Sequence, residues 1–299
     1  MIRILPDLRR AIAGGEAVVA LESSVIAQGL PSPANRDAVE RMTAAVRGAG
    51  AHPAITAVVR GVPALGLEPG ELERFLTGNG VRKVSARDLA LAVVQGADGA
   101  TTVAASLALA HRAGVPVFAT GGIGGVHREP PFDESADLVE LAHTPMVVVC
   151  AGAKAILDLP ATMERLETLG VPVVGFRTSE LPGFYTVDTG LRLSARAESA
   201  AEIAAIFRAH RALGRTQALV VVQPPPAGIA LPRVEVERAV QHALDRARAD
   251  GVRGAAATPY LLAAVTAVTD GRSLGVNLAL LERNAWLAAE VAVAMVGAG

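Results

Sequence analysis

Two lysines stand out among the charged residues of this 299-residue chain. Lysine and arginine together number 28, yet only Lys83 and Lys154 are lysines. An arginine side chain stays protonated in proteins, whereas the pKa of a lysine falls readily on burial. A neutral lysine amine can attack a carbonyl carbon and form a Schiff base. We therefore expect these positions to need something that arginine cannot supply.

Lys154 follows the apolar run VVVCA and lies among the small residues of GAKA. Small neighbours leave room for a substrate and favour a nucleophile, although a phosphate-binding lysine or a chance survivor of coding bias would fit too. Lys83 lies between Arg82 and Arg87 in RKVSARD. There a charged lysine is better suited to hold a phosphate or a sugar hydroxyl, with Ser85 and Arg87 as helpers. The alternative for Lys83 is a solvated strand end.

Glu22 ends another apolar run, AVVAL, and begins ESSVIAQGLP. Glutamates are rarely buried unless they are paired or functional. Burial raises the pKa of a carboxyl group, so a buried Glu22 would suit a general acid that works near neutral pH. A helix cap or an ion-pair partner is the alternative for this residue.

A glycine-rich stretch, TGGIGGVHRE over Thr120–Glu129, lets backbone N–H groups approach an anion closely. It matches neither the dinucleotide-binding fingerprint nor the phosphate-binding loop of nucleotide hydrolases. His127 at its end could serve as a base, a ligand or a structural hydrogen-bonding group. Asp133 and Asp137 follow in FDESADLVEL. Their carboxylates are ligands of the kind that Mg²⁺ or Mn²⁺ prefers, but Asp133 could equally be the N-cap of the next helix.

The elements that must position these residues alternate between short apolar runs and longer helical patterns. Runs that are apolar throughout are typical of buried parallel strands, and we predict strands over 17–21, 55–59, 115–120, 146–151, 171–176 and 218–223. We predict helices, each ending at a glycine, over 33–50, 199–214 and 234–251, and a mostly helical tail from Thr258.

This alternation predicts an α/β fold, a three-layer α/β/α arrangement with a mainly parallel central sheet, formed by a single domain over residues 1–299. In such sheets, ligands bind beyond the carboxyl ends of the strands. Glu22, the glycine-rich stretch and Lys154 each follow a predicted strand. We therefore expect them to meet at one site although they lie far apart in sequence.

The composition narrows the class of protein. Net charge is −1 and aromatic residues make up 3%, which argues against a nucleic-acid partner. No uncharged run reaches the roughly 18 residues of a membrane span, and the charged N-terminus does not resemble a signal peptide, so we expect a soluble, cytoplasmic protein. Cys150 is the only cysteine, which excludes an intramolecular disulfide and a cysteine-cluster metal site.

The stretches that carry these residues run in a fixed order from about residue 16 to 295: VALESSVIAQGLP, RKVSARDL, GATTVAASL, FATGGIGGVHRE, FDESADLVELA, VVVCAGAKAILDLP, TPYLL and NLALLERNA. Together they resemble the pseudouridine-5′-phosphate glycosidases. The resemblance implies an α/β/α homotrimer that reversibly cleaves the C–C glycosidic bond of pseudouridine 5′-phosphate. Its products would be ribose 5-phosphate and uracil, and its cofactor a divalent metal, typically Mn²⁺.

The resemblance also assigns roles. It implies that Glu22 is the acid and that Lys154 forms a Schiff base with the ring-opened ribose. It places the metal on Asp133 and the substrate contacts on Lys83, Val103 through its backbone, Ser135, Ala136, Asp137, His127 and Asn277. The stretch VVVQPPPAGIALP departs from the family pattern, because Gln223 and Pro225 stand where an Asn-Pro-Ile-Pro-like run is expected.

Two other functions fit the same residues. A Schiff-base aldolase or lyase that acts on a pentose phosphate would also use Lys154 and Glu22, but it would have no use for uracil. A non-catalytic sugar-phosphate sensor would leave both residues without a task. A C-glycoside explains the lysine best, because carbon, unlike the nitrogen of an N-glycoside, cannot leave simply after protonation of the base.

Overall fold

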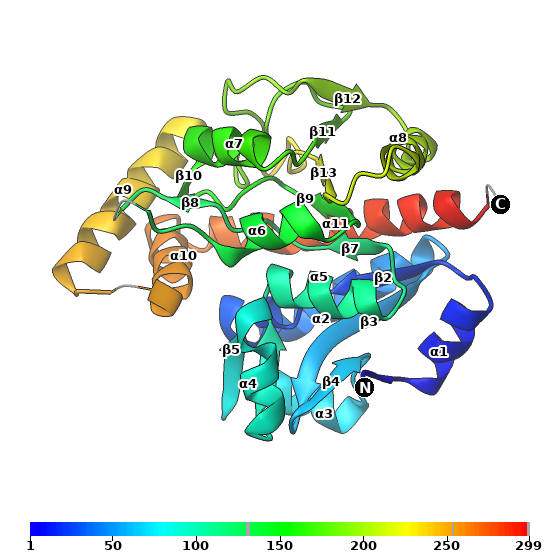
Figure 1. The fold of residues 1–299 in the computed structure, drawn as a ribbon. Coiled ribbons are helices and arrows are strands. Elements are labelled where there is room, and N and C mark those ends of the chain that lie inside the picture. Colours follow the sequence, from blue (N-terminus) through cyan, green and yellow to red (C-terminus); the bar gives the residue numbers. More distant parts are fainter. Residues whose placement is uncertain (130–131, 253, 298–299) are drawn as a thin grey trace.

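The computed structural model of the protein describes residues 1–129, 132–252 and 254–297. A large twisted sheet runs through its centre in the order β1-β4-β3-β2-β7-β9-β13-β11-β12, and β6 and β5 extend it from β3 (Figure 1). The strands of this sheet are β1 (Arg3–Ile4), β2 (Val18–Leu21), β3 (His52–Val59), β4 (Val62–Leu65), β5 (Val81–Val84), β6 (Asp98–Thr101), β7 (Val117–Ala119), β9 (Val147–Cys150), β11 (Val173–Phe176), β12 (Ala195–Ala197) and β13 (Leu219–Val222).

Helices cover both faces of this sheet (Figure 1). On one face, Val18 and Ala20 pack with α1 (Pro6–Ala13), α5 (Val103–Arg112), α6 (Ala136–His143), α7 (Leu159–Thr168), α9 (Arg233–Ala249) and α10 (Ala257–Val268). On the other face, Val19 and Leu21 pack with α2 (Ala34–Gly48), α8 (Ala200–Ala212) and α11 (Arg272–Val296). Successive side chains of a strand point to opposite faces, so a strand that is apolar throughout contributes side chains to the hydrophobic cores on both sides of the sheet. The predicted three-layer α/β/α fold is confirmed.

The predicted elements are present with small shifts at their ends. All six predicted strands occur, five of them one or two residues shorter at one or both ends, and all six take part in the central sheet. The helices at 34–48, 200–212 and 233–249 end as expected, because Gly50, Gly214 and Gly251 follow them with φ values of +87°, +74° and +66°. Glycine adopts this left-handed conformation without the steric cost that a side chain brings.

One edge of the sheet is antiparallel, which the sequence did not predict. Strand β3 is eight residues long; its first half pairs with β2 in parallel, and its second half pairs with β4 and β6 in antiparallel register. Arg60 and Gly61, both with positive φ, form the tight turn between β3 and β4. Such a two-residue turn matches the twist of a hairpin.

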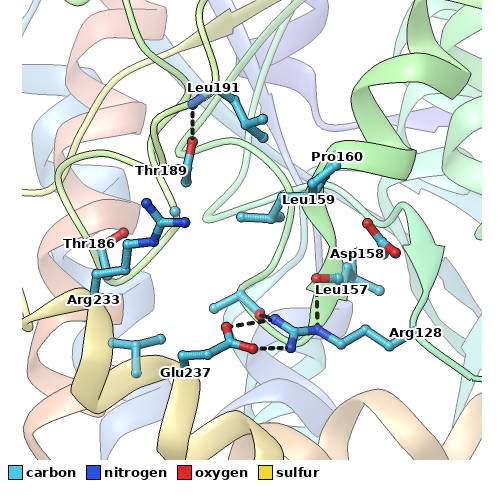
Figure 2. Close-up of a pocket in the computed structure, with 13 residues that line it drawn as sticks. Arg128, Leu157, Asp158, Leu159, Pro160, Thr186, Thr189, Leu191, Arg233 and Glu237 are labelled. Atoms are coloured by element: carbon cyan, nitrogen blue, oxygen red, sulfur yellow. Dashed lines mark hydrogen bonds and ion pairs between the residues drawn. The ribbon is translucent and has the colours of Figure 1, made fainter.

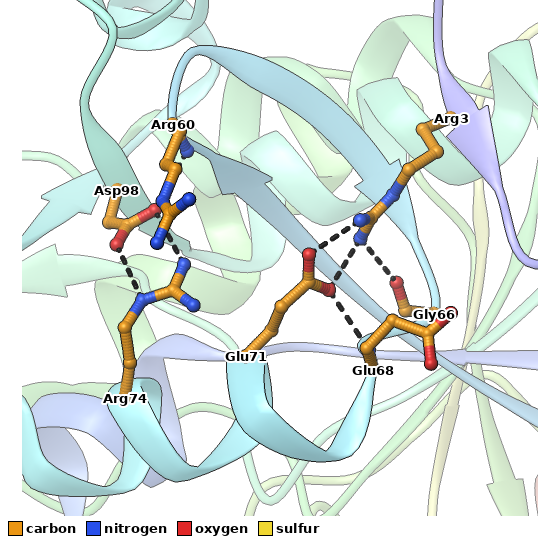
Figure 3. A network of polar contacts seen from close by, with 7 residues as sticks. All are labelled: Arg3, Arg60, Gly66, Glu68, Glu71, Arg74 and Asp98. Carbon is orange, nitrogen blue, oxygen red and sulfur yellow. Dashed lines mark hydrogen bonds and ion pairs between the residues drawn. The ribbon is translucent and has the colours of Figure 1, made fainter.

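Ion pairs fasten this edge to the helix α3 (Pro69–Thr77), as Figure 3 shows. The guanidinium group of Arg3 donates to both carboxylate oxygens of Glu71, at 2.5 and 2.6 Å. Arg74 pairs with Asp98, whose carboxylate also accepts from the N–H of Arg60 at 2.7 Å. The contacts join the N-terminal strand, the hairpin and α3 into one unit.

The remaining elements are short. They are α4 (Leu89–Val94), the two-stranded sheet of β8 (Val126–His127) and β10 (Leu157–Asp158), the π-helical turn η1 (Val25–Gly29) and the 3₁₀ turns η2 (Ala86–Asp88) and η3 (Gly254–Ala256). Within the described ranges, the protein contains no helix with the length and apolar character needed to cross a membrane.

Candidate active site

A cavity of about 400 Å³ opens beyond the carboxyl ends of β2, β7 and β9. Every residue predicted for the site lines it: Glu22, Lys83, Val103, His127, Asp133, Ser135, Ala136, Asp137, Lys154 and Asn277. These residues come from strand ends, helix N-termini and the C-terminal helix. The structure therefore brings the predicted residues together, while their individual roles stay predictions.

Glu22 lies directly after β2 and is 5% exposed. The hydroxyl of Ser24 donates to one carboxyl oxygen at 2.5 Å, and the hydroxyl of Thr120, at the end of β7, donates to the other. A hydroxyl group can donate or accept. The two hydroxyls can therefore hold the Glu22 carboxyl in place whether it carries a proton or not.

The turn that carries Lys154 runs beside the glycine-rich stretch. The N–H of Lys154 donates to the carbonyl of Ile123 at 3.1 Å, and the N–H of Ile123 donates to the carbonyl of Gly152 at 3.0 Å. Gly152 has φ +84°, and a Cβ atom there would lie 2.9 Å from the carbonyl oxygen of Pro182. Only glycine fits this bend, which starts the turn that presents the lysine to the cavity.

Lys83, on β5, lines the cavity. Although the residue is exposed to solvent, desolvation of its ammonium group lowers the pKa of Lys83, and the like charge of Lys154 acts in the same direction. The carboxylates of Asp137 and Glu22 oppose that shift. The two lysines therefore lie close enough to repel each other, an arrangement that a bound anion would relieve.

Asp137 supports the cavity wall. Its carboxylate accepts from the N–H of Ala104, in the first turn of α5, at 2.9 Å, and from the N–H of Gly124 at 2.8 Å. A Cβ atom on Gly124 would lie 2.1 Å from the hydroxyl of Ser135, so this close approach requires glycine. Both oxygens of Asp137 are thus engaged with backbone, and the residue ties α5 and α6 to the glycine-rich stretch.

Ser135, not Asp133, is the N-cap of α6, and its hydroxyl accepts from the N–H of Asp137 at 3.2 Å. The helix begins at Ala136, one residue after the serine that caps it, and serine is a preferred capping residue. The capping role that Asp133 could have had is therefore ruled out. Asp133 itself lines the cavity.

His127 lies near Asp133 and both lysines. Burial lowers the pKa of the His127 imidazole, the charges of Lys154 and Lys83 lower it further, and only Asp133 opposes them. The ring is therefore neutral at neutral pH and can accept a hydrogen bond.

Cys150, the last residue of β9, is fully buried. Burial raises the pKa of its thiol to about 12 and leaves the thiol unreactive.

The side chains around Asp133 fit only an open metal site. Among the described residues, no group of three or more His, Cys, Asp or Glu side chains is placed to hold a metal ion. A hard divalent cation can nevertheless bind through one carboxylate, with water and substrate phosphate as its other ligands. The carboxylate of Asp133 fits that mode of binding. It does not fit a site in which several protein side chains surround the metal.

Sequence reasoning missed several residues of this site. Ser24 and Thr120 hold the Glu22 carboxyl, and Phe184 and Gln28 line the cavity. Thr120 is the last residue of the predicted strand 115–120, and Ser24 lies three residues after the predicted strand 17–21, a signal that could have pointed to them. Phe184 and Gln28 carry no such signal, because only the fold brings them to the cavity.

A second cavity, of about 430 Å³, lies behind the Lys154 turn (Figure 2). Leu157 lines both cavities, so the turn forms a wall between them. The guanidinium of Arg128 donates to the carbonyls of Leu157 and Ala155, at 3.3 and 3.5 Å, and pairs with Glu237 of α9. The charged groups here brace the lysine turn from behind.

Comparisons with known proteins agree with this arrangement. The model of the indigoidine synthase A-like protein family matches residues 7–294. The chain is 63% identical to a pseudouridine-5′-phosphate glycosidase of Gemmatimonas aurantiaca, over 96% of this chain and 94% of that protein. It is 51% identical to a protein of the same name from Herpetosiphon aurantiacus, over 98% and 97% of the two chains.

Solved structures show the same fold. A prealnumycin C-glycosynthase in complex with ribulose 5-phosphate superposes with a TM-score of 0.92 at 36% identity, covering 100% of this chain and 98% of that one. An indigoidine synthase A-like protein from Thermotoga maritima gives a TM-score of 0.91 at 35% identity, covering 99% and 97%. With matches over its whole length, the chain belongs to the family of pseudouridine-5′-phosphate glycosidases and indigoidine synthase A-like proteins.

Proposed function

We propose that this protein is a pseudouridine-5′-phosphate glycosidase that interconverts pseudouridine 5′-phosphate and water with ribose 5-phosphate and uracil. One observation carries the proposal: Glu22 and Lys154, which reach the site from different strands, line a single cavity in a chain 63% identical to a protein of that name. The ribulose 5-phosphate held by the related C-glycosynthase supports a pentose phosphate as the ligand.

In this proposal Glu22 donates a proton to the ribose ring oxygen, and the C1′–O4′ bond breaks as the amine of Lys154 bonds to C1′. The C1′–C5 bond to the base then breaks. The nitrogen, which became a cation when it bonded to C1′, first gives up a proton, and its lone pair then forms the iminium. The electron pair of the broken bond stays with the pyrimidine, which takes a proton at C5 and leaves as uracil. Water adds to the iminium and releases ribose 5-phosphate and the free lysine.

The phosphate of the substrate would lie between Lys83 and the N-terminus of α5, where the backbone N–H of Val103 has no partner within the helix. Such N-terminal donors and a nearby ammonium group favour an anion. Asp137 holds that helix end in place through Ala104. His127 and Asn277 line the remainder of the cavity and could contact sugar hydroxyls.

Asp133 would hold a divalent cation, with Mn²⁺ as the proposed metal. A bound cation would supply positive charge that offsets the charge of the substrate phosphate. Since Asp133 provides a single carboxylate, we expect weak binding of the metal in the absence of substrate and tighter binding in its presence. Calorimetric titration of Mn²⁺ with and without ribose 5-phosphate measures this difference.

Borohydride trapping tests the covalent step. Reduction in the presence of ribose 5-phosphate should add one sugar phosphate to the chain, and digestion should locate it on Lys154. With only two lysines in the sequence, Lys83→Arg provides a clean control that keeps the label, and Lys154→Arg should lose it. A label on Lys83, or on no lysine, would contradict the mechanism.

A Schiff-base aldolase or lyase that acts on a pentose phosphate remains the competing function, since it would share the trapped lysine. Uracil separates the two functions. The glycosidase must consume ribose 5-phosphate only when uracil is present and must release uracil from pseudouridine 5′-phosphate. Consumption of ribose 5-phosphate without uracil would favour the aldolase.

We further propose that the protein works as a cytoplasmic homotrimer, as the resemblance to its family implies. Light scattering coupled to size-exclusion chromatography should give a mass three times that of the 299-residue chain. A mass equal to one or two chains at micromolar concentration would exclude the trimer.

A further inference from the structure

A buried asparagine of the C-terminal helix contacts the backbone that supports two segments of the site, the one that holds Glu22 and the turn that carries Lys154. Asn284, on α11, is fully buried. Its side-chain Nδ2 donates to the carbonyl of Thr120 at 2.8 Å and approaches the carbonyl of Gly121 at 3.3 Å. These two carbonyls belong to the segment that follows β7.

Each of the two carbonyls leads to one of the reacting groups. Thr120 is the residue whose hydroxyl donates to the Glu22 carboxyl. The carbonyl of Gly121 also accepts from the N–H of Ala151 at 2.9 Å, at the start of the turn that presents Lys154. One amide group thus contacts the backbone behind the acid and the backbone behind the amine.

A second amide holds the first. Gln223, after β13, is 3% exposed, and its Nε2 donates to the Asn284 Oδ1 and to the carbonyl of Arg283, both at 3.0 Å. Its own backbone N–H donates to the carbonyl of Cys150, at the end of β9. Gln223 therefore fixes which way the Asn284 amide faces, since the oxygen that accepts from it cannot also face the two carbonyls.

We propose that Asn284, oriented by Gln223, is a positioning residue that sets the Glu22 carboxyl and the Lys154 amine at their working separation. This inference rests on the function proposed above. Neither amide lines the cavity or touches its contents. Their effect would reach the substrate only through Thr120 and the Ala151–Lys154 turn.

The burial of these groups makes the arrangement demanding. A buried carbonyl that loses its donor cannot turn to water and must shift toward another partner. Gly121 lies against α11, since a Cβ atom on Gly121 would be only 3.2 Å from the Asn277 Oδ1. The backbone after β7 therefore cannot move toward α11. Loss of the Asn284 donors should therefore displace both the segment after β7 and the Ala151–Lys154 turn.

Asn284→Asp is the test variant, because it keeps the shape and replaces the two donors by a carboxylate oxygen. We expect kcat to fall about 100-fold, the loss that a misplacement of about 1 Å can cause, with KM nearly unchanged because Lys83 and α5 are untouched. Amide hydrogen exchange should accelerate in 119–124 and 150–155 together.

Thr269→Val is the control. Thr269 follows α10 and is fully buried, and its hydroxyl donates to the carbonyl of Val265 at 2.9 Å and to the hydroxyl of Ser273 at 3.0 Å, but it does not line the cavity. The variant should lower the melting temperature without the selective loss of kcat. Gln223→Met, which keeps side-chain length but not the donors, should give the Asn284→Asp pattern in a milder form, and it serves as the test if Asn284→Asp does not fold.

Three results would overturn the proposal: wild-type kcat in a folded variant at Asn284 or Gln223, exchange that accelerates only within α11, or a loss of kcat in Thr269→Val equal to that in Asn284→Asp. The wild type is assayed in parallel. If it releases no uracil, the proposed function fails, while hydrogen exchange still decides whether Asn284 positions the two segments.

Discussion

Both oxygens of the Glu22 carboxyl accept hydrogen bonds from hydroxyl groups, those of Ser24 and Thr120, although the residue is buried. A cationic partner would favour the carboxylate alone, whereas a hydroxyl can reverse its role when the carboxyl gains a proton. The surroundings therefore suit a group that must give up a proton and take it back in each reaction cycle.

Glu22→Gln should fold, bind ribose 5-phosphate and release uracil 10²- to 10⁴-fold more slowly than the wild type, the usual contribution of a general acid. The amide keeps the shape of the carboxyl but has no proton to give. Steady-state uracil release measures the loss, and Glu40→Gln on the exposed face of α2 is the control. Near-normal turnover in Glu22→Gln would remove Glu22 from the acid role.

Lys83 gives the site a pH dependence. Desolvation, helped by Lys154, lowers its pKa, so the ammonium loses its proton at a lower pH than an ordinary lysine, whose pKa is about 10.4. Because only the charged form attracts phosphate, KM should rise as pH increases through that lowered value. Lys83→Arg should keep KM flat over the same range, since arginine stays charged. A KM that rises equally in both proteins would assign the effect to another group.

At the scale of elements, one group that makes the fold sensitive to acid is Glu71 of α3, which does not line the cavity. The pKa of Glu71 is lowered, first by the hydrogen bonds from Arg3, with the backbone N–H of Glu68 adding to the effect (Figure 3). A carboxyl whose pKa is lowered on folding stabilises the fold fully above its unfolded pKa, about 4.3 for glutamate. That stability is lost as pH falls from there through the lowered value.

Glu71→Gln should therefore cost about 1 kcal/mol at pH 7 and reduce the dependence of stability on pH below about 4.3. Urea unfolding at pH 7 and pH 3.5 measures both effects. Asp7→Asn is the control, because the pair of Asp7 with Arg10 is exposed and should contribute little. An equal loss of unfolding free energy in the two variants would show that the Arg3–Glu71 pair stabilises the fold no more than the exposed Asp7–Arg10 pair.

The elements around the site were predictable because their signals are local. Glu22 and Lys154 each end a continuous apolar run, and parallel sheets place such ends at one edge. The antiparallel edge was missed because β4 and β6 are four-residue strands interrupted by Pro63 and Gly99, residues that read as a loop. Asn284 was missed because its partners follow strands far away in the sequence.

Asp137 illustrates a further limit. It lines the cavity, while its contact with the substrate stays a prediction, and the sequence could not show that two backbone N–H groups, those of Ala104 and Gly124, already occupy its oxygens. Gln223 illustrates the opposite case. It looked like a departure from the family pattern in a loop, yet it is buried and bonded to α11. Hydrogen-bond partners of this kind are brought together by the packing of elements. They do not lie at a regular separation along the sequence, so no sequence pattern predicts them.

At the scale of the whole molecule, one ligand would touch distant parts of the chain. The cavity joins Lys83 on β5 at one edge of the sheet, the Lys154 turn near its centre, and Asn277 on the C-terminal helix. A ligand that binds only the folded protein stabilises it by an amount that grows with the logarithm of its concentration over Kd. If residues 1–299 form a single domain, that stabilisation must be shared by the entire fold.

Ribose 5-phosphate at about 100 times its Kd should therefore add about 2.7 kcal/mol and raise the melting temperature by about 4 °C, in one calorimetric transition that moves as a unit. Ribose at the same concentration should leave the transition unmoved, because in the proposed binding mode Lys83 and the N-terminus of α5 hold the phosphate. Lys154→Arg should show a smaller shift with ribose 5-phosphate, since it cannot add a covalent bond to the non-covalent contacts. Two transitions, only one of which responds to the ligand, would instead divide the chain into two domains and confine the sugar-phosphate site to one of them.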